Sequence, residues 1–188
     1  MPVSAFGRFA AGFAVAGLMA AALPARAEIE GIMQQCEMKL CLHYHASITV
    51  PEGWEENKEA SRELGVQMLL PKGKDFDAAP AKIYALVRSD NKQVSDVVRQ
   101  AYKDWHERAK NGKVEKLAAV DRANGKPAFE RHQFDAPKVK EQGFEITSLT
   151  TDTDKSGKTY VVVLCLTANT REALKSAEAA YLSILKAY

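Results

Sequence analysis

The stretch "YVVVLCL", residues 160–166, is apolar at every position and follows the turn sequence "DKSG" at residues 154–157. A short apolar run without alternating polar residues is typical of a strand whose two faces are both covered by other layers. Such a strand lies inside a sheet and not at its edge. The stretch therefore predicts a sheet that has further elements packed on both of its faces.

The other predicted strands all precede this run in the sequence. Residues 40–50 alternate, so that Leu40, Leu42, Tyr44, Ala46, Ile48 and Val50 form a core-facing set and Cys41, His43, His45, Ser47 and Thr49 the opposite one. "GVQMLLP" (65–71) and "AKIYALVRS" (81–89) predict two more strands. Hairpins are predicted around Asn124-Gly125 and around residues 155–157. This pattern is typical of a mostly antiparallel sheet.

Two segments change to the helical period. Residues 94–109 repeat apolar side chains every three or four positions, and "NG" at 111–112 is a stop signal. A second amphipathic stripe runs from Ala173 to Tyr188, and Asn169 with Glu172 is a plausible capping pair at its start. Strands, helix, strands and helix in this order predict an α+β fold, with a mostly antiparallel sheet and helices packed on it.

The first 27 residues read as a cleaved signal peptide. Arg8 precedes the apolar stretch 9–23, and "ARA" at 25–27 is a small-x-small cleavage site. We therefore expect an exported, periplasmic protein with an N-terminal arm at residues 28–39 and one domain at 40–188. Two of the 26 basic residues, Arg8 and Arg26, lie in the signal, which leaves 24 basic against 24 acidic residues. This balance gives no reason to expect nucleic acid as a partner, and no later apolar run predicts a transmembrane segment.

Several stretches together resemble the PsbP-like family, which includes the bacterial DcrB-like proteins. They are "SITVPEGW", "VQMLLP", "AKIYALVRS", "NGKPAFERHQF" and the final "GKTYVVVLCLTANTREALKSAEAAYLSILKAY", and the resemblance covers residues 40 to 188. It implies an α-β-α sandwich, in which helices flank both faces of the sheet. It also implies a non-catalytic accessory, assembly or chaperone-like role, and it brings no set of active-site residues.

The segment "CEMKLCLHYH" (36–45) concentrates soft metal ligands. Cys36, Cys41, His43 and His45 suit copper or zinc, and the last three alternate along one strand face. Their spacing matches no strong zinc pattern. In an exported protein, Cys36 and Cys41 can instead form a disulfide, which would close a small loop and remove two ligands. Both interpretations stay open at this stage, as does a pair of free thiols.

Other reactive side chains have simpler explanations. Cys165 lies in the two-sided apolar run and is predicted to be a buried, inert thiol. "DTDKSG" (152–157) begins like a calcium loop but lacks the acidic twelfth residue, so a hairpin turn is the better interpretation. His106 and His132 have no recognisable catalytic partners in the sequence, and no nucleophile motif is present. We therefore expect a non-enzymatic protein that binds another protein or an envelope component, with copper or zinc binding as the alternative.

Overall fold

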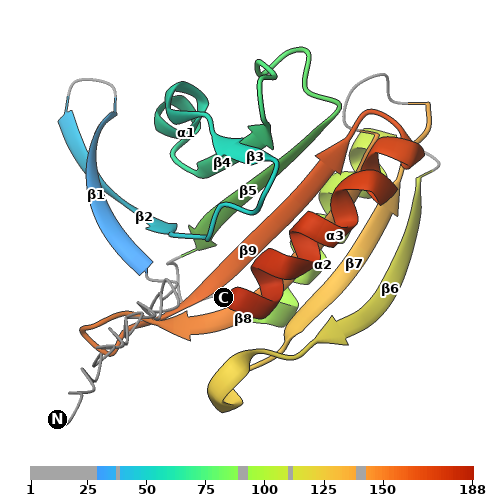
Figure 1. The fold of residues 1–188 in the computed structure, drawn as a ribbon. Coiled ribbons are helices and arrows are strands. Elements are labelled where there is room, and N and C mark those ends of the chain that lie inside the picture. The colour runs from blue at the N-terminus through green and yellow to red at the C-terminus, as the bar shows by residue number, and fades with distance from the viewer. Residues whose placement is uncertain (1–28, 37–38, 89–92, 110–111, 139–142) are drawn as a thin grey trace, which may run out of the picture.

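The computed structural model describes residues 29–36, 39–88, 93–109, 112–138 and 143–188 (Figure 1). The predicted signal peptide at residues 1–27 lies outside these ranges. Seven antiparallel strands form the main sheet in the spatial order β3-β4-β5-β9-β8-β7-β6. In that order their bounds are Trp54–Glu56, Gln67–Pro71, Ala81–Arg88, Thr159–Ala168, Phe144–Thr153, Phe129–Asp135 and Lys113–Val120.

Strand β9 is the central strand of this sheet. It pairs with β5 on one side and with β8 on the other, and every residue from Tyr160 to Ala168 is buried. The prediction that this run is covered on both faces is confirmed. Its side chains alternate between two separate apolar clusters, so that Leu164 and Leu166 belong to one and Val161 and Val163 to the other.

Helix α3 (Arg171–Ala187) covers the first of these two faces. It buries Leu174, Tyr181 and Leu185 against the sheet. The Tyr181 hydroxyl donates to the carbonyl of Leu164 over 2.7 Å and lies 2.7 Å from the hydroxyl of Ser148. A buried phenol needs such partners, because an unmatched hydroxyl costs free energy in the core. The N-cap is Thr170, which accepts from the amide of Ala173, and not the predicted Asn169.

Helices α1 (Lys58–Leu64) and α2 (Val94–Ala109) lie on the opposite face. Val97 and Val98 of α2 pack against the β9 side chains that point away from α3. Ala60 of α1 packs against Met68 in a further apolar cluster on this face. Tyr84 contacts both this cluster and the one that includes Val97 and Val98 of α2. The fold is thus α+β, with an antiparallel sheet flanked by helices on both faces, as predicted (Figure 1). None of the helices in the described ranges is long and apolar enough to cross a membrane.

Two local features of the structure differ from what the sequence predicted. Helix α1 was not predicted, because its seven residues carry only a weak apolar stripe; Asn57 caps its start and Gly65 ends it at a φ of 65°. The predicted hairpin at Asn124-Gly125 exists, but those residues lie in a short 3₁₀ turn (Ala123–Gly125) within a longer connection between β6 and β7.

The segment at residues 40–50 was predicted to be the first strand of the main sheet, and this is wrong. Strand β2 (Lys39–Ala46) pairs instead with β1 (Ile29–Cys36), which occupies the predicted arm, and the two form a separate antiparallel sheet. After Ala46 the backbone is held near β4 by a side chain. The amide of Gln67 accepts from the N–H of Ile48 at 2.6 Å and donates to its carbonyl at 3.2 Å. These two bonds replace the strand ladder that was expected here.

Candidate functional site

The hairpin formed by β1 and β2 has one apolar face that is only partly covered. At its base, Ile29 and Ala46 face each other and are buried in the main core. Four residues further along each strand, Met33 and Leu42 face each other and are 61% and 53% exposed. Leu42 and Val50 were predicted to be core residues, and both are exposed. The alternation was predicted correctly, but the hairpin extends beyond the layer that would cover it (Figure 1).

A groove of about 300 Å³ lies beside this face of the hairpin. Leu64, at the end of α1, lines it from the other side and is 55% exposed. The remaining lining residues come from β2, from the α1 to β4 turn and from the end of β5. They are Leu42, Tyr44, Gly65, Val66, Leu86, Val87 and Arg88. Large apolar side chains that gather on an open surface in this way are typical of an interaction site.

Strand β1 also presents an open edge. Within the described residues, its eight residues pair only with β2. The outward N–H and C=O groups of an edge strand are a template for another strand. A two-stranded sheet gains stability from a third strand, since an isolated hairpin is marginal in water. The apolar face and the strand edge therefore belong to the same element.

The predicted metal ligands lie on this hairpin. Cys41, His43 and His45 alternate along β2, opposite Gln34, Ile32 and Glu30 of β1. The side chain of His45 is half-buried, and its Nε2 lies 3.8 Å from a carboxylate oxygen of Glu30. No three His, Cys, Asp or Glu side chains in the described part of the chain are placed to hold an ion. The side chains of Cys36, Cys41 and His43 lie outside that description, so the metal site stays a prediction.

The register also bears on the predicted Cys36–Cys41 disulfide. Cys36 is opposite Lys39, which places Cys41 at the diagonal position on the partner strand. Diagonal neighbours in an antiparallel pair are about 7–8 Å apart, whereas disulfides join Cα atoms at about 4.4–6.8 Å. A bridge therefore needs the two strand ends to approach each other beyond regular ladder geometry. The disulfide stays a prediction.

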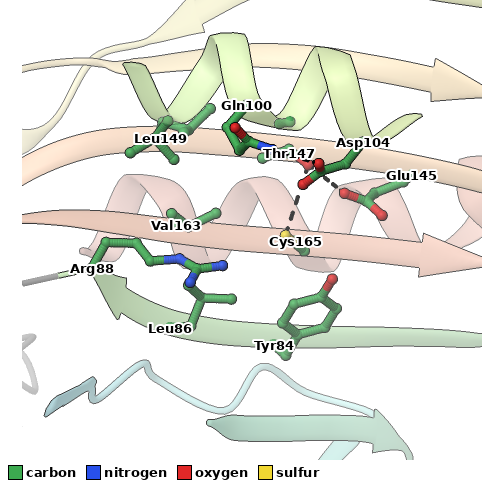
Figure 2. Close-up of a pocket in the computed structure, with 12 residues that line it drawn as sticks. Tyr84, Leu86, Arg88, Gln100, Asp104, Glu145, Thr147, Leu149, Val163 and Cys165 are labelled. Carbon is green, nitrogen blue, oxygen red and sulfur yellow. Dashed lines mark hydrogen bonds between the residues drawn. The ribbon is translucent and has the colours of Figure 1, made fainter. Parts of the chain in front are cut away.

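A second site lies between α2 and the sheet, in a cavity of about 370 Å³ (Figure 2). Its middle section is apolar and is lined by Leu86, Val97, Ala101, Leu149 and Val163. Polar groups lie at its two ends. Figure 2 shows Arg88 at one end, and Asp104 and Glu145 at the other. These residues are not recognisable as a site in the sequence, because they come from β5, α2 and β8, which only the folded chain brings together.

The acidic end of this cavity is a network of polar side chains. The Thr147 hydroxyl donates to Glu145 over 2.5 Å and lies 3.8 Å from the sulfur of Cys165. On the α2 side of the cavity, the side-chain amide of Gln100 donates to Asp104, one helical turn away, over 2.7 Å. Burial, together with the negative charge of Glu145, raises the pKa of the Cys165 thiol far above its usual range. Cys165 is therefore protonated at neutral pH, in agreement with the predicted buried, inert thiol.

The two histidines outside the hairpin differ in their surroundings. His106 is exposed on α2, whereas His132 on β7 is only 3% exposed. Nδ1 of His132 lies 2.7 Å from the hydroxyl of Tyr102, and Nε2 lies 2.9 Å from a carboxylate oxygen of Glu130. The bond to His132 lowers the pKa of Glu130, and Lys116 adds to this effect. The arrangement fixes α2 to β7, and the His132 ring itself is enclosed.

The "DTDKSG" stretch ends β8 with Asp152 and Thr153, and its residues 154–157 lie in the turn between β8 and β9, as predicted. Asp154 accepts from the amide and the hydroxyl of Ser156, from the amide of Lys158 and from the hydroxyl of Tyr160, at 2.6 to 3.0 Å. The hydroxyl bond from Ser156 is the main cause that lowers the pKa of Asp154 to about 2. These carboxylate oxygens are thus engaged by the turn itself, and Asp152 bonds instead to Arg122 and Lys126.

The chain matches no protein-family model, and no curated protein matches it significantly.

Proposed function

We propose that this protein is an exported, non-catalytic accessory protein of the PsbP-like or DcrB-like type, which binds an extended segment of a partner protein along its β1–β2 hairpin. The export signal and the resemblance come from the sequence. The observation that carries the proposal is the apolar hairpin face, which is continuous with the core at Ile29 and Ala46 and open at Met33 and Leu42.

The geometry of the hairpin supports a partner of one particular chemistry. An added strand pairs with the open edge of β1 through main-chain hydrogen bonds, and side chains at alternate positions of that strand point to the same face as Met33. The face beside the groove is apolar, so those alternate positions have to be apolar. On the opposite face the hairpin carries Glu30 and His45, which suit a polar side chain. We therefore infer an amphipathic extended segment as the occupant.

The non-catalytic part of the proposal is supported by the enclosed surroundings of two potentially reactive side chains. Cys165 is buried, and its raised pKa keeps it a weak nucleophile. His132 is enclosed between Tyr102 and Glu130, so that a substrate has no direct access to either ring nitrogen. Both side chains fit a role in packing and in holding α2 against the sheet.

Site-specific photo-crosslinking tests the proposal. A photoreactive residue replaces Leu42, Leu64 or, as a matched control, Val50, which is also exposed but does not line the groove. In envelope extract, we expect the same discrete crosslinked protein from positions 42 and 64 and none from position 50. Addition of that protein should then slow amide hydrogen exchange in β1 more than in the edge strand β6. Equal products from all three positions, or unchanged exchange in β1, would refute the proposal.

A further inference from the structure

The cavity under α2 is separate from the hairpin and has the features of a small-molecule site. Its volume of about 370 Å³ falls in the range of ligand pockets, and it combines an apolar middle section with polar side chains at its two ends. We propose that this cavity binds an elongated organic amine, with the ammonium group held between Asp104 and Glu145 and the hydrocarbon part along the apolar section.

The shape of the cavity sets the length of this ligand. The α2 residues that line it run from Val97 to Asp104, a distance of about 10 Å along the helix axis at 1.5 Å per residue. The sheet side follows the same direction through Leu86 and Tyr84 of β5, which lie opposite Val163 and Cys165 of β9. The site is therefore a channel between a helix and a sheet, and a chain of about six carbons fits its length.

The acidic end sets the charge of the ligand. Glu145 is only 9% exposed and comes from the sheet, whereas Asp104 comes from α2 and closes the cavity from the opposite side (Figure 2). Carboxylates accept hydrogen bonds and attract cations, and the attraction is stronger where the surroundings exclude water. An ammonium group has three donors, which match Asp104, Glu145 and the hydroxyl of Thr147. A carboxylate ligand would instead meet two like charges.

Arg88 at the other end does not reverse this preference. It is exposed, so that solvent screens its charge. The section between Arg88 and the acidic end is lined by Leu86, Val163 and Leu149, which offer no partner to a charge. A ligand with its anionic group at Arg88 would have to place its hydrocarbon chain toward Asp104 and Glu145. A cationic head at the acidic end is therefore the better match for the whole cavity.

Calorimetric titration with hexylamine and hexanoate, which share a six-carbon chain, tests this inference. We expect hexylamine to bind and hexanoate to bind at least tenfold more weakly. Glu145→Gln should weaken hexylamine at least tenfold, because its partner charge is buried. Asp104→Asn should weaken it about fivefold, because Asp104 is exposed. Glu107→Gln removes the same charge from the exposed surface of α2 and should leave the affinity unchanged.

A cavity-filling variant separates binding in the cavity from surface attraction. Ala101→Leu adds three carbons in the middle of the channel without removing a polar group, and a thermal unfolding curve shows whether the variant is folded. The folded variant should lose hexylamine binding at least tenfold. Should it retain full binding, or should hexanoate bind as tightly as hexylamine, the inference is overturned. An equal loss in Glu107→Gln and Asp104→Asn, or no binding of hexylamine to the unmodified protein, would overturn it as well.

Discussion

The hydroxyl of Tyr102 on α2 lies 2.7 Å from Nδ1 of His132 on β7, and this bond connects a helix to a strand 30 residues away in sequence. The Tyr102 ring also packs edge-on against Phe134 at a centroid distance of 5.9 Å. Polar and apolar contacts of the same side chain therefore fix the second half of α2.

Replacing Tyr102 with phenylalanine should destabilise the protein by about 1–3 kcal/mol, because a buried ring nitrogen of His132 then loses its partner. Urea unfolding measures the change. Tyr188→Phe is the matched control, since the buried hydroxyl of Tyr188 has no hydrogen-bond partner among the described residues. The control should be neutral or slightly stabilising. Equal losses in the two variants would show that the Tyr102–His132 bond adds nothing specific.

A second prediction concerns Arg122, whose side chain is fully buried. It bonds to Asp152 over 2.6 Å and to the carbonyls of Thr151 and Tyr188, and it lies over the Tyr188 ring at 4.8 Å. Burial alone would raise the pKa of Asp152, but the bonds from Thr153, Arg122 and Lys126 lower it.

Arg122→Met should therefore cost about 3 kcal/mol or more in the free energy of unfolding, because it leaves Asp152 with only part of its compensating charge. Denaturant unfolding at neutral pH measures this loss. Lys116→Met removes a cation from an exposed pair with Glu130 and should cost less than about 1 kcal/mol. A small effect of Arg122→Met would mean that apolar packing replaces the ion pair.

The third prediction is a pH dependence that comes from Asp154. Its pKa of about 2 in the folded protein lies below the value of about 3.9 for an unfolded aspartate. A carboxyl group whose pKa is lowered by folding stabilises the protein above its unfolded pKa, and this contribution is lost as the pH falls through the folded pKa.

The unmodified protein should therefore be more stable than Asp154→Asn above about pH 4, and the difference should shrink between about pH 4 and pH 2. Urea midpoints of both proteins across this range measure the difference. The comparison removes the titration of Glu130 and Asp152, which are common to both. A difference that stays constant down to pH 2 would contradict the assignment to Asp154.

The fourth prediction concerns the cysteines and the alternative metal hypothesis. Cys165 is 4% exposed, so it should react with a thiol reagent only after unfolding. With Cys36 and Cys41 joined, we expect no reactive thiol per chain in the folded protein and one in denaturant. Three thiols in denaturant would exclude the disulfide. Copper or zinc retained in native mass spectra, and released by a chelator together with two new thiols, would support metal binding at Cys36–His45 instead.

The parts of the fold that the sequence predicted are those that local pattern determines. The bounds of α2 agree with the periodic stretch 94–109, and β9 contains the two-sided run at 160–166. Both segments are long and have a single clear period. Helix α1 is short, and its main signals are the capping residue Asn57 and the final Gly65. Capping signals alone were too weak to indicate a helix there.

The sites were harder to predict, because burial depends on which layers meet. Alternation in residues 40–50 indicated an apolar face, but only the placement of the hairpin shows that Ala46 is covered and Leu42 is open. Glu145 stands out in sequence only as an acidic residue within the run "FEITSL". Its position across from Asp104 results from the way α2 lies over β8 and β9, which no local pattern contains.

The position of β9 also has a consequence for the order of folding. Among the described strands, β3 to β5 and β6 to β8 make two separate halves of the sheet, and β9 lies between them and joins them. The β5–β9 pairing joins residues that are far apart in the sequence, from Arg88 with Val161 to Ala81 with Ala168, so it closes a loop of more than 70 residues. Such non-local pairing is slow. During synthesis the two halves cannot pair into one sheet until β9 has been made. A chain cut before residue 159 therefore has no continuous sheet.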